Sequence, residues 1–216
     1  MNKLILTIFS FAVIVVACTK TNYNNSKTVH IPTLVLKGPA VYSTAKGTGT
    51  YVDPGAILTD ENNVVSTLTT PSGALPNLAK ENFYSVVYNK TTQYNYNLTV
   101  SRLVLVTGST RDLSGQYARS TNGVIINLTK NSAGLYTIDN VGGVANTPAN
   151  AAYIVSAFMG QLSNDSLYIP TQNNANVGSF YCDNTSYIPG PAGKDTLKWV
   201  VENGSFGTSV RTFIKQ

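Results

Sequence analysis

Hydrophobic and polar residues alternate in short runs along most of the chain, and turn-forming residues separate these runs. The clearest alternation lies at Tyr94 to Ser101, where Tyr, Leu and Val occupy every second position between Asn, Thr and Ser. A period of two is typical of a strand with one buried face. Arg102 falls on the apolar side of this pattern, so a β-bulge or a strand end is expected there. The pattern predicts a strand over Tyr94 to Val106, interrupted at Arg102.

Shorter runs of the same kind precede this strand. Ile31 to Leu36 is predicted to lie at the edge of a sheet, because Pro32 cannot donate a ladder hydrogen bond. Further strands are expected around Tyr51 and Ile57, over Val64 to Thr69 after a polar turn at 60–63, and over Phe83 to Tyr88. Several short strands separated by turns indicate a β-sandwich.

Hairpin signals dominate the C-terminal half. Asn122-Gly123 separates two apolar runs, and this dipeptide is the strongest short-range signal for a hairpin. Asn203-Gly204 marks a second hairpin, between Leu197 to Glu202 and Thr208 to Ile214. Only Ala151 to Leu162 is ambiguous between helix and strand. We expect an antiparallel meander in this half, and the pattern leaves open whether it forms a barrel or a sandwich.

The composition agrees with a fold made of strands. Hydrophobic residues make up 43% of the 216 residues and charged residues only 12%, about half the charged share of an average soluble domain. Asn, Thr, Ser and Tyr supply the remaining polarity, and β-branched and aromatic residues favour strands. The predicted fold class is all-β.

The first eighteen residues have a different pattern. Lys3 precedes an apolar run over Leu4 to Val16, and the small residue Ala17 then stands directly before Cys18. The run is shorter than the roughly 20 apolar residues of a membrane span, and it has the form of a secretory signal peptide. The position of the cysteine resembles the lipobox of bacterial lipoproteins. This resemblance implies cleavage before Cys18 and attachment of lipid to its thiol.

The resulting organisation has four parts. Residues 1–17 are the expected lipoprotein signal peptide, and residues 18–28 are a flexible tether rich in Asn and Thr. Residues 29–107 and 108–216 are the two predicted β domains, which meet near Gly108 to Thr110. The expected location is the cell envelope, with a lipid anchor in the outer membrane. Whether the protein faces the surface or the periplasm is left open.

Part of the N-terminal half resembles a known family. Leu36-Lys37-Gly38, Gly49 to Ala56 with its Tyr-x-Asp-Pro-Gly motif, Tyr84 to Tyr88 and Ser101 to Val106 follow the order seen in bacterial surface immunoglobulin-like domains. Such domains are common in exported lipoproteins of Bacteroidetes. The C-terminal half is similar, more loosely, to the domain that follows this module in uncharacterised Bacteroidetes lipoproteins. The resemblance implies an immunoglobulin-like sandwich and an envelope location, but no chemistry.

The distribution of charge argues against nucleic acid as a partner. The formal net charge is +5, but the Lys and Arg residues are scattered singly along the chain. A nucleic-acid interface would gather them on one face or one helix. The expected partners are instead the membrane, through the lipid, and a polysaccharide or an outer-membrane uptake protein.

No catalytic residue, metal site or cofactor is predicted. The single histidine, His30, lies beside the tether and is poorly placed for an oriented imidazole. With Cys18 lipidated, Cys182 is left without a disulfide partner and is expected to be a small buried apolar residue. A pair of carboxylates could still serve glycoside hydrolysis. The acidic residues that would have to supply it lie at turns and strand ends: Asp112, Asp139, Asp165, Asp183, Asp195 and Glu202.

Aromatic residues are the more promising candidates for binding. The chain has thirteen tyrosines and one tryptophan, and aromatic rings with a polar tip can pack on sugars. Tyr181 and Tyr187 flank a polar segment before the 189–191 loop, so they are the candidate ligand-binding residues. Trp199 is expected in the core. Ser166 and Thr196 lie in Asp-Ser/Thr-Leu triplets that resemble the O-glycosylation sites of Bacteroidetes.

Three functions therefore remain open. The first is a non-enzymatic envelope lipoprotein that binds a glycan or another ligand as an accessory of uptake. The second is a structural or adhesive stalk, and the third, ranked last, is a carboxylate-based glycoside hydrolase. An exposed cluster of aromatic residues in the C-terminal half would favour the first function.

Overall fold

The computed structural model describes residues 30–216. The predicted signal peptide, the lipid-anchor cysteine Cys18 and the tether at 18–28 lie outside the described residues. Within residues 30–216 the chain is all-β, as expected, with strands throughout and two short 3₁₀ helices, η1 (Pro148–Tyr153) and η2 (Pro191–Gly193). In this part of the chain no helix is long and apolar enough to cross a membrane.

The first six strands form two three-stranded sheets. One sheet has the order β1-β3-β4, all antiparallel, with bounds β1 Thr33–Leu36, β3 Ala56–Thr59 and β4 Val65–Leu68. The other has the order β2-β6-β5, with β2 Val41–Ala45, β6 Asn97–Thr107 and β5 Asn82–Thr91. In it β2 runs parallel to β6 and β5 antiparallel. As expected, β1 is an edge strand.

One core lies between these sheets. Leu34, Ala56 and Leu58 from the first sheet form a buried cluster with Val86, Tyr88 and Val104 from the second. Two sheets that share one apolar core form a β-sandwich, as the short strands indicated. Membership of the immunoglobulin-like family stays a prediction.

The structure corrects the start of the longest predicted strand. β6 begins at Asn97, and Tyr94 and Tyr96 lie in the connection from β5, where they are 47% and 42% exposed. Asn95 has φ 63°, a left-handed conformation that interrupts an extended strand. Tyr94 and Tyr96 continue the alternation of β6 into the turn before it, so the pattern alone placed the start of the strand too early.

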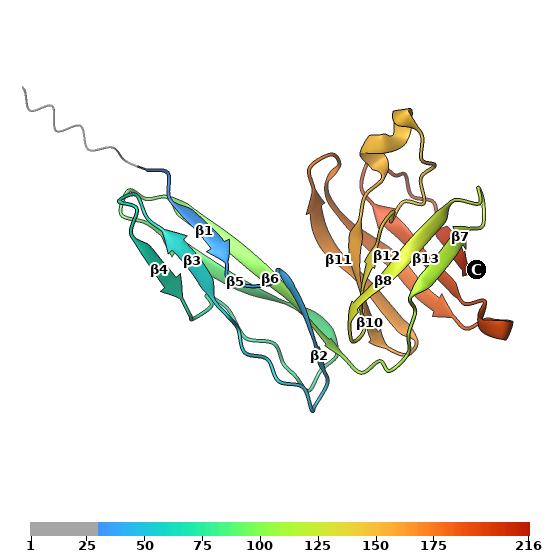
Figure 1. Ribbon diagram of the computed structural model, residues 1–216, viewed down its shortest axis with the longest axis horizontal. Coiled ribbons are helices and arrows are strands. Elements are labelled where there is room, and N and C mark those ends of the chain that lie inside the picture. Colours follow the sequence, from blue (N-terminus) through green and yellow to red (C-terminus); the bar gives the residue numbers. More distant parts are fainter. Residues whose placement is uncertain (1–29) are drawn as a thin grey trace, which may run out of the picture. The chain divides into compact units, whose positions relative to one another are not determined.

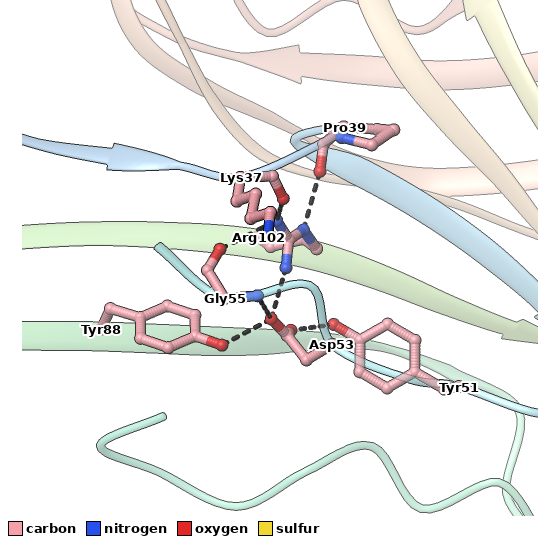
Figure 2. Close-up of polar contacts among 7 residues, drawn as sticks. All are labelled: Lys37, Pro39, Tyr51, Asp53, Gly55, Tyr88 and Arg102. Carbon is pink, nitrogen blue, oxygen red and sulfur yellow. Dashed lines mark hydrogen bonds and ion pairs between the residues drawn. The ribbon is translucent and has the colours of Figure 1, made fainter. Parts of the chain in front are cut away.

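Arg102 does not mark a bulge, contrary to the sequence-based expectation. It pairs with Val86 in an unbroken register between β5 and β6, and its side chain is fully buried. Its Nη1 lies 2.6 Å from Asp53 Oδ1, and it donates hydrogen bonds to the carbonyls of Pro39 and Lys37 (Figure 2). The charge is tolerated inside the sandwich because a carboxylate and several carbonyls surround it.

Asp53 collects hydrogen bonds from the same motif that suggested the family. It accepts bonds from the hydroxyls of Tyr51 and Tyr88 and from the backbone N–H of Gly55 (Figure 2). Burial alone would raise the pKa of this carboxyl, but these hydrogen bonds and Arg102 lower it to about 2. The Tyr-x-Asp-Pro-Gly motif is thus part of a buried polar network.

The last eight strands close into a barrel. Neighbours along the chain pair antiparallel, and β14 pairs with β7 to complete the closure (Figure 1). The strands are β7 Gly115–Arg119, β8 Ile125–Ser132, β9 Leu135–Ile138, β10 Ala157–Ser163, β11 Ser166–Asn174, β12 Gly178–Ile188, β13 Thr196–Glu202 and β14 Arg211–Lys215. The choice between barrel and sandwich in this half is therefore settled as a barrel. The predicted boundary at 107/108 falls between β6 and β7, and the division into independent domains stays a prediction.

Inward-facing side chains fill the barrel. Trp199 is fully buried and stacks on Phe213 at 4.5 Å between ring centroids. Cys182 is also buried, and burial raises the pKa of its thiol to about 12. Both residues occupy the core, as expected. The ambiguous segment 151–162 divides between the end of η1 and most of β10.

The connections divide between the two ends of the barrel. Because neighbouring strands run in opposite directions, the β7–β8, β9–β10, β11–β12 and β13–β14 connections gather at one end. Two of these connections are long, residues 139–156 with η1 and residues 203–210. The chain enters β7 at the other end. In Figure 1, η1 marks the end of the barrel that carries the long connections.

Candidate ligand pocket at one end of the barrel

A pocket of about 460 Å³ opens between the two long connections. This volume is within the range of small-molecule sites, roughly 300–1,000 Å³. Its lining combines charged, amide, hydroxyl and aromatic side chains: Arg119, Asn150, Tyr153, Ser205, Phe206 and Arg211. They come from the end of β7, from η1, from the β13–β14 connection and from the start of β14. Distant segments thus meet at one barrel end.

Two arginines form the polar side of the pocket. Arg119 donates from Nη1 to the carbonyls of Gly142 and Gly143, at 3.2 and 3.0 Å. Arg211 donates to the carbonyls of Gly142, Phe206 and Ser209 at 2.6–3.1 Å. Backbone carbonyls therefore fix both guanidinium groups, and they do so without neutralising either charge.

The β9–β10 connection brings the carbonyls of Gly142 and Gly143 close to the arginines of the pocket. Gly143 has φ 55°, and a Cβ atom there would lie 2.8 Å from Arg119 Cδ and from the ring of Phe213. Asn140 holds the loop from both sides, because its amide donates to Val144 O and its oxygen accepts from Val144 N. A glycine and an asparagine thus permit the tight loop on which the arginines rest.

Neither arginine of the pocket has a carboxylate partner among residues 30–216. The ion pairs of this part of the chain involve Lys46, Arg102, Arg111 and Lys130 instead. Burial lowers the pKa of Arg119, and burial followed by the charge of Arg119 lowers that of Arg211. Burial thus disfavours the charged form of both groups, and the repulsion by Arg119 adds to it at Arg211, where the charge of Glu202 acts in the opposite direction.

One donor of this pair lacks a partner. Arg119 Nε is buried and makes no hydrogen bond, although buried polar atoms are nearly always bonded. The side chain of Arg211 lies almost wholly inside, with the residue 4% exposed. The pocket therefore presents positive charge from two side chains that backbone carbonyls hold in place.

Aromatic rings form the other side. Tyr153 and Phe206 pack edge to face, with ring centroids 6.4 Å apart, and Tyr153 is 40% exposed. The guanidinium carbon of Arg211 lies 5.7 Å from the centre of the Phe206 ring. Cation–π contact of this kind orients both groups.

Tyr187, one of the two candidate ligand-binding residues, faces the interior of the barrel. It is 7% exposed and belongs to the barrel core, where its ring lies 4.5 Å from the guanidinium carbon of Arg111 and its hydroxyl accepts from Arg111 Nη1. Residue 187 faces inward because β12 shifts register between Asp183 and Ser186, so Tyr181 and Tyr187 have opposite environments despite their even spacing.

The remaining candidates lie apart from the pocket. Tyr181 is 43% exposed, on β12, and does not line it. Ser166 is exposed at the start of β11, and Thr196 is half-buried at the start of β13. Ligand binding at Tyr181 and modification of Ser166 or Thr196 stay predictions.

Four of the six acidic candidates take part in local contacts, and among them Asp195 accepts from the backbone N–H of Gly190 at 3.3 Å. Asp112 pairs with Lys130 at 3.1 Å, Asp165 lies 3.8 Å from Arg111, and Asp139 accepts from Asn127. Within residues 30–216, no three His, Cys, Asp or Glu side chains gather in a way that could hold a metal ion.

Sequence reasoning missed the two arginines of the pocket. Arg211 occupies an inward position of β14, two residues before the buried Phe213. Arg102 in β6 shows the same pattern, a cation on the apolar side of an alternating strand. This position of a cation among apolar residues could have indicated that both side chains are buried. Nothing local indicated that Arg119 would meet Arg211.

Comparisons with known proteins give little further guidance. No family model matches the chain, and no curated protein matches it. The crystal structure of a lipoprotein from Bacteroides thetaiotaomicron is similar to this chain at 20% sequence identity and a TM-score of 0.40. The match covers 86% of this chain and all of that one.

Proposed function

We propose that the protein is a non-enzymatic lipoprotein of the bacterial cell envelope that binds a glycan in the pocket between the β9–β10 and β13–β14 connections. The envelope location rests on the lipobox-like sequence that ends at Cys18. The binding role rests on one observation, an open pocket that combines an exposed tyrosine with amide, hydroxyl and guanidinium groups.

The lining matches the chemistry of a sugar. The ring of Tyr153 can pack on the C–H face of a pyranose, and its hydroxyl can bond a sugar hydroxyl. Asn150 and Ser205 add amide and hydroxyl groups that donate and accept hydrogen bonds. An apolar surface with a few convergent polar groups is what defines a small-ligand site.

A pair of tyrosines tests the site directly. Tyr153 and Tyr181 are exposed to nearly the same degree, 40% and 43%, but only Tyr153 lines the pocket. The full chain, purified in detergent, would first be tested on a broad glycan array. The bound glycan would then be titrated by calorimetry into the wild type and into the Tyr153→Ala and Tyr181→Ala variants.

We expect Tyr153→Ala to weaken binding about tenfold or more, by analogy with aromatic anchors in other interfaces. Tyr181→Ala should leave affinity unchanged, and neither variant should lose much thermal stability because both rings are exposed. The opposite result would move the site to Tyr181 on β12, one of the two residues that the sequence pattern suggested. If the wild type binds no glycan, the structural or adhesive role becomes the better account.

A further inference from the structure

We propose that the glycan is acidic, and that its carboxylate or sulfate group lies between the guanidinium groups of Arg119 and Arg211. This inference rests on the proposed function, because it names the chemical class of the ligand for the same pocket. It is carried by the position of two guanidinium groups in the lining of one cavity, that of the half-buried Arg119 and that of the buried Arg211, neither of which pairs with a carboxylate within residues 30–216.

The balance of charge in the pocket favours an anionic ligand. In residues 30–216 no carboxylate pairs with either arginine, and both donate to the single carbonyl of Gly142. Holding two cations side by side in a partly buried site is unfavourable unless an anion compensates them. An oxyanion in the pocket would supply that compensation, whereas a neutral sugar would not.

The geometry of the guanidinium donors also suits an oxyanion. A guanidinium has five N–H groups in a planar fork that suits a two-oxygen acceptor. The carbonyl contacts use only Nη1 of Arg119, so its Nη2 makes no hydrogen bond in the structure. Arg211 also makes fewer contacts than it has N–H groups. The two arginines therefore hold the loops through backbone carbonyls, and some of their N–H groups remain for an oxyanion.

The rest of the pocket lining favours a sugar as the carrier of the anion. Phosphate or sulfate alone would need only the arginines, but Tyr153 and Phe206 add an aromatic wall beside them. A sugar that carries an acid group uses both sides of the pocket at once. Carboxylate and sulfate share this chemistry.

The experiment compares three short oligosaccharides on the full chain by calorimetry: a trigalacturonate, a sulfated trisaccharide and neutral maltotriose. Short ligands are chosen because the protein carries a net charge of +5 and would attract long polyanions without a site. Arg119→Gln removes one guanidinium of the pocket. Lys194→Gln is the matched control, because it removes one exposed positive charge beside η2, which lies outside the pocket.

We expect at least one acidic ligand to bind about tenfold or more tightly than maltotriose, and Arg119→Gln to abolish most of that difference. Lys194→Gln should leave the affinity unchanged. Whichever of the two acidic ligands binds more tightly identifies the anionic group as a carboxylate or a sulfate. Equal losses in both variants would mean diffuse attraction, and would overturn the assignment to the pocket.

The outcomes separate the two proposals. If neutral glycans bind as well as acidic ones and depend on Tyr153, the glycan-binding role stands and the acidic class is wrong. If nothing binds, both fall. Should Arg119→Gln melt far below the wild type, Arg119→Lys keeps the charge but loses the fork. Its affinity for the acidic ligand should then fall several-fold, and an unchanged affinity would contradict the proposal.

Discussion

Arg119 and Arg211 donate hydrogen bonds to the same carbonyl oxygen, that of Gly142, at 3.2 and 3.1 Å. The shared acceptor holds two like charges side by side at the end of a barrel. Gly142 and Gly143 make this possible, since a side chain on either residue would collide with its neighbours. The loop and the charged site therefore depend on one another.

Gly143→Ala is expected to destabilise the protein. The new Cβ atom would meet Arg119 Cδ and the Phe213 ring at 2.8 Å, in a backbone with φ 55°. Strain and overlap together should reduce the free energy of unfolding by about 2–4 kcal/mol, measured by urea denaturation. Gly123→Ala is the control, because Gly123 has φ 70° with nothing within 4 Å of a Cβ atom. Equal losses would show that the close packing at Gly143 contributes nothing.

Asp53 should make stability depend on acid pH. Its pKa is about 2 in the folded protein, against 3.8 for the free side chain. As pH falls, the unfolded chain binds a proton first, so stability is complete above about pH 4 and declines from there towards pH 2. Denaturation midpoints measured across this range should fall in the wild type.

The Asp53→Asn variant tests the cause. It leaves the buried Arg102 without its carboxylate and should lower the free energy of unfolding by about 3–5 kcal/mol at neutral pH. The remaining dependence between pH 4 and 2 should be weaker than in the wild type. Asp112→Asn is the control for the loss of an ion pair. It breaks an exposed pair with Lys130, so it should lower the free energy of unfolding at neutral pH by only about 0–1 kcal/mol. A pH profile unaltered by Asp53→Asn would assign the acid sensitivity to other carboxyls.

Tyr187 and Tyr181 should differ sharply when each is replaced by Ala. Tyr187 packs in the barrel core and accepts a hydrogen bond from Arg111, so its removal should cost about 3–5 kcal/mol of unfolding free energy. Tyr181→Ala should change it by less than about 1 kcal/mol, because the ring is 43% exposed. Thermal denaturation of both variants measures the difference. Similar melting temperatures would argue against the burial of Tyr187.

Cys18→Ser tests the lipid anchor. The acylated thiol would be lost, and the protein should then accumulate as an unprocessed precursor or appear in the soluble fraction. Labelling with a radioactive or clickable fatty acid, followed by membrane fractionation after carbonate washing, measures both effects. Normal processing and retention in the washed membrane would show that residues 1–18 do not act as a lipoprotein signal.

Local patterns in the sequence determined the all-β class and many of the turns. Asn122-Gly123 predicted a hairpin, and the structure has β7 and β8 on either side, with φ 70° at Gly123. Trp199 and Cys182 were expected in the core and are buried there. These features follow from turn chemistry and from the period of two, which act over a few residues.

Tertiary structure decided what distant residues do together. Arg102 reaches Asp53 across 49 positions, and Arg211 reaches Gly142 across 69, so neither contact leaves a trace in a local pattern. The register shift in β12 turned Tyr187 inward, against its spacing from Tyr181. Closure of the barrel through β14 and β7 placed Arg211 near Arg119. Strand pairing fixes such neighbours, and pairing depends on the packing of the whole barrel rather than on any one segment.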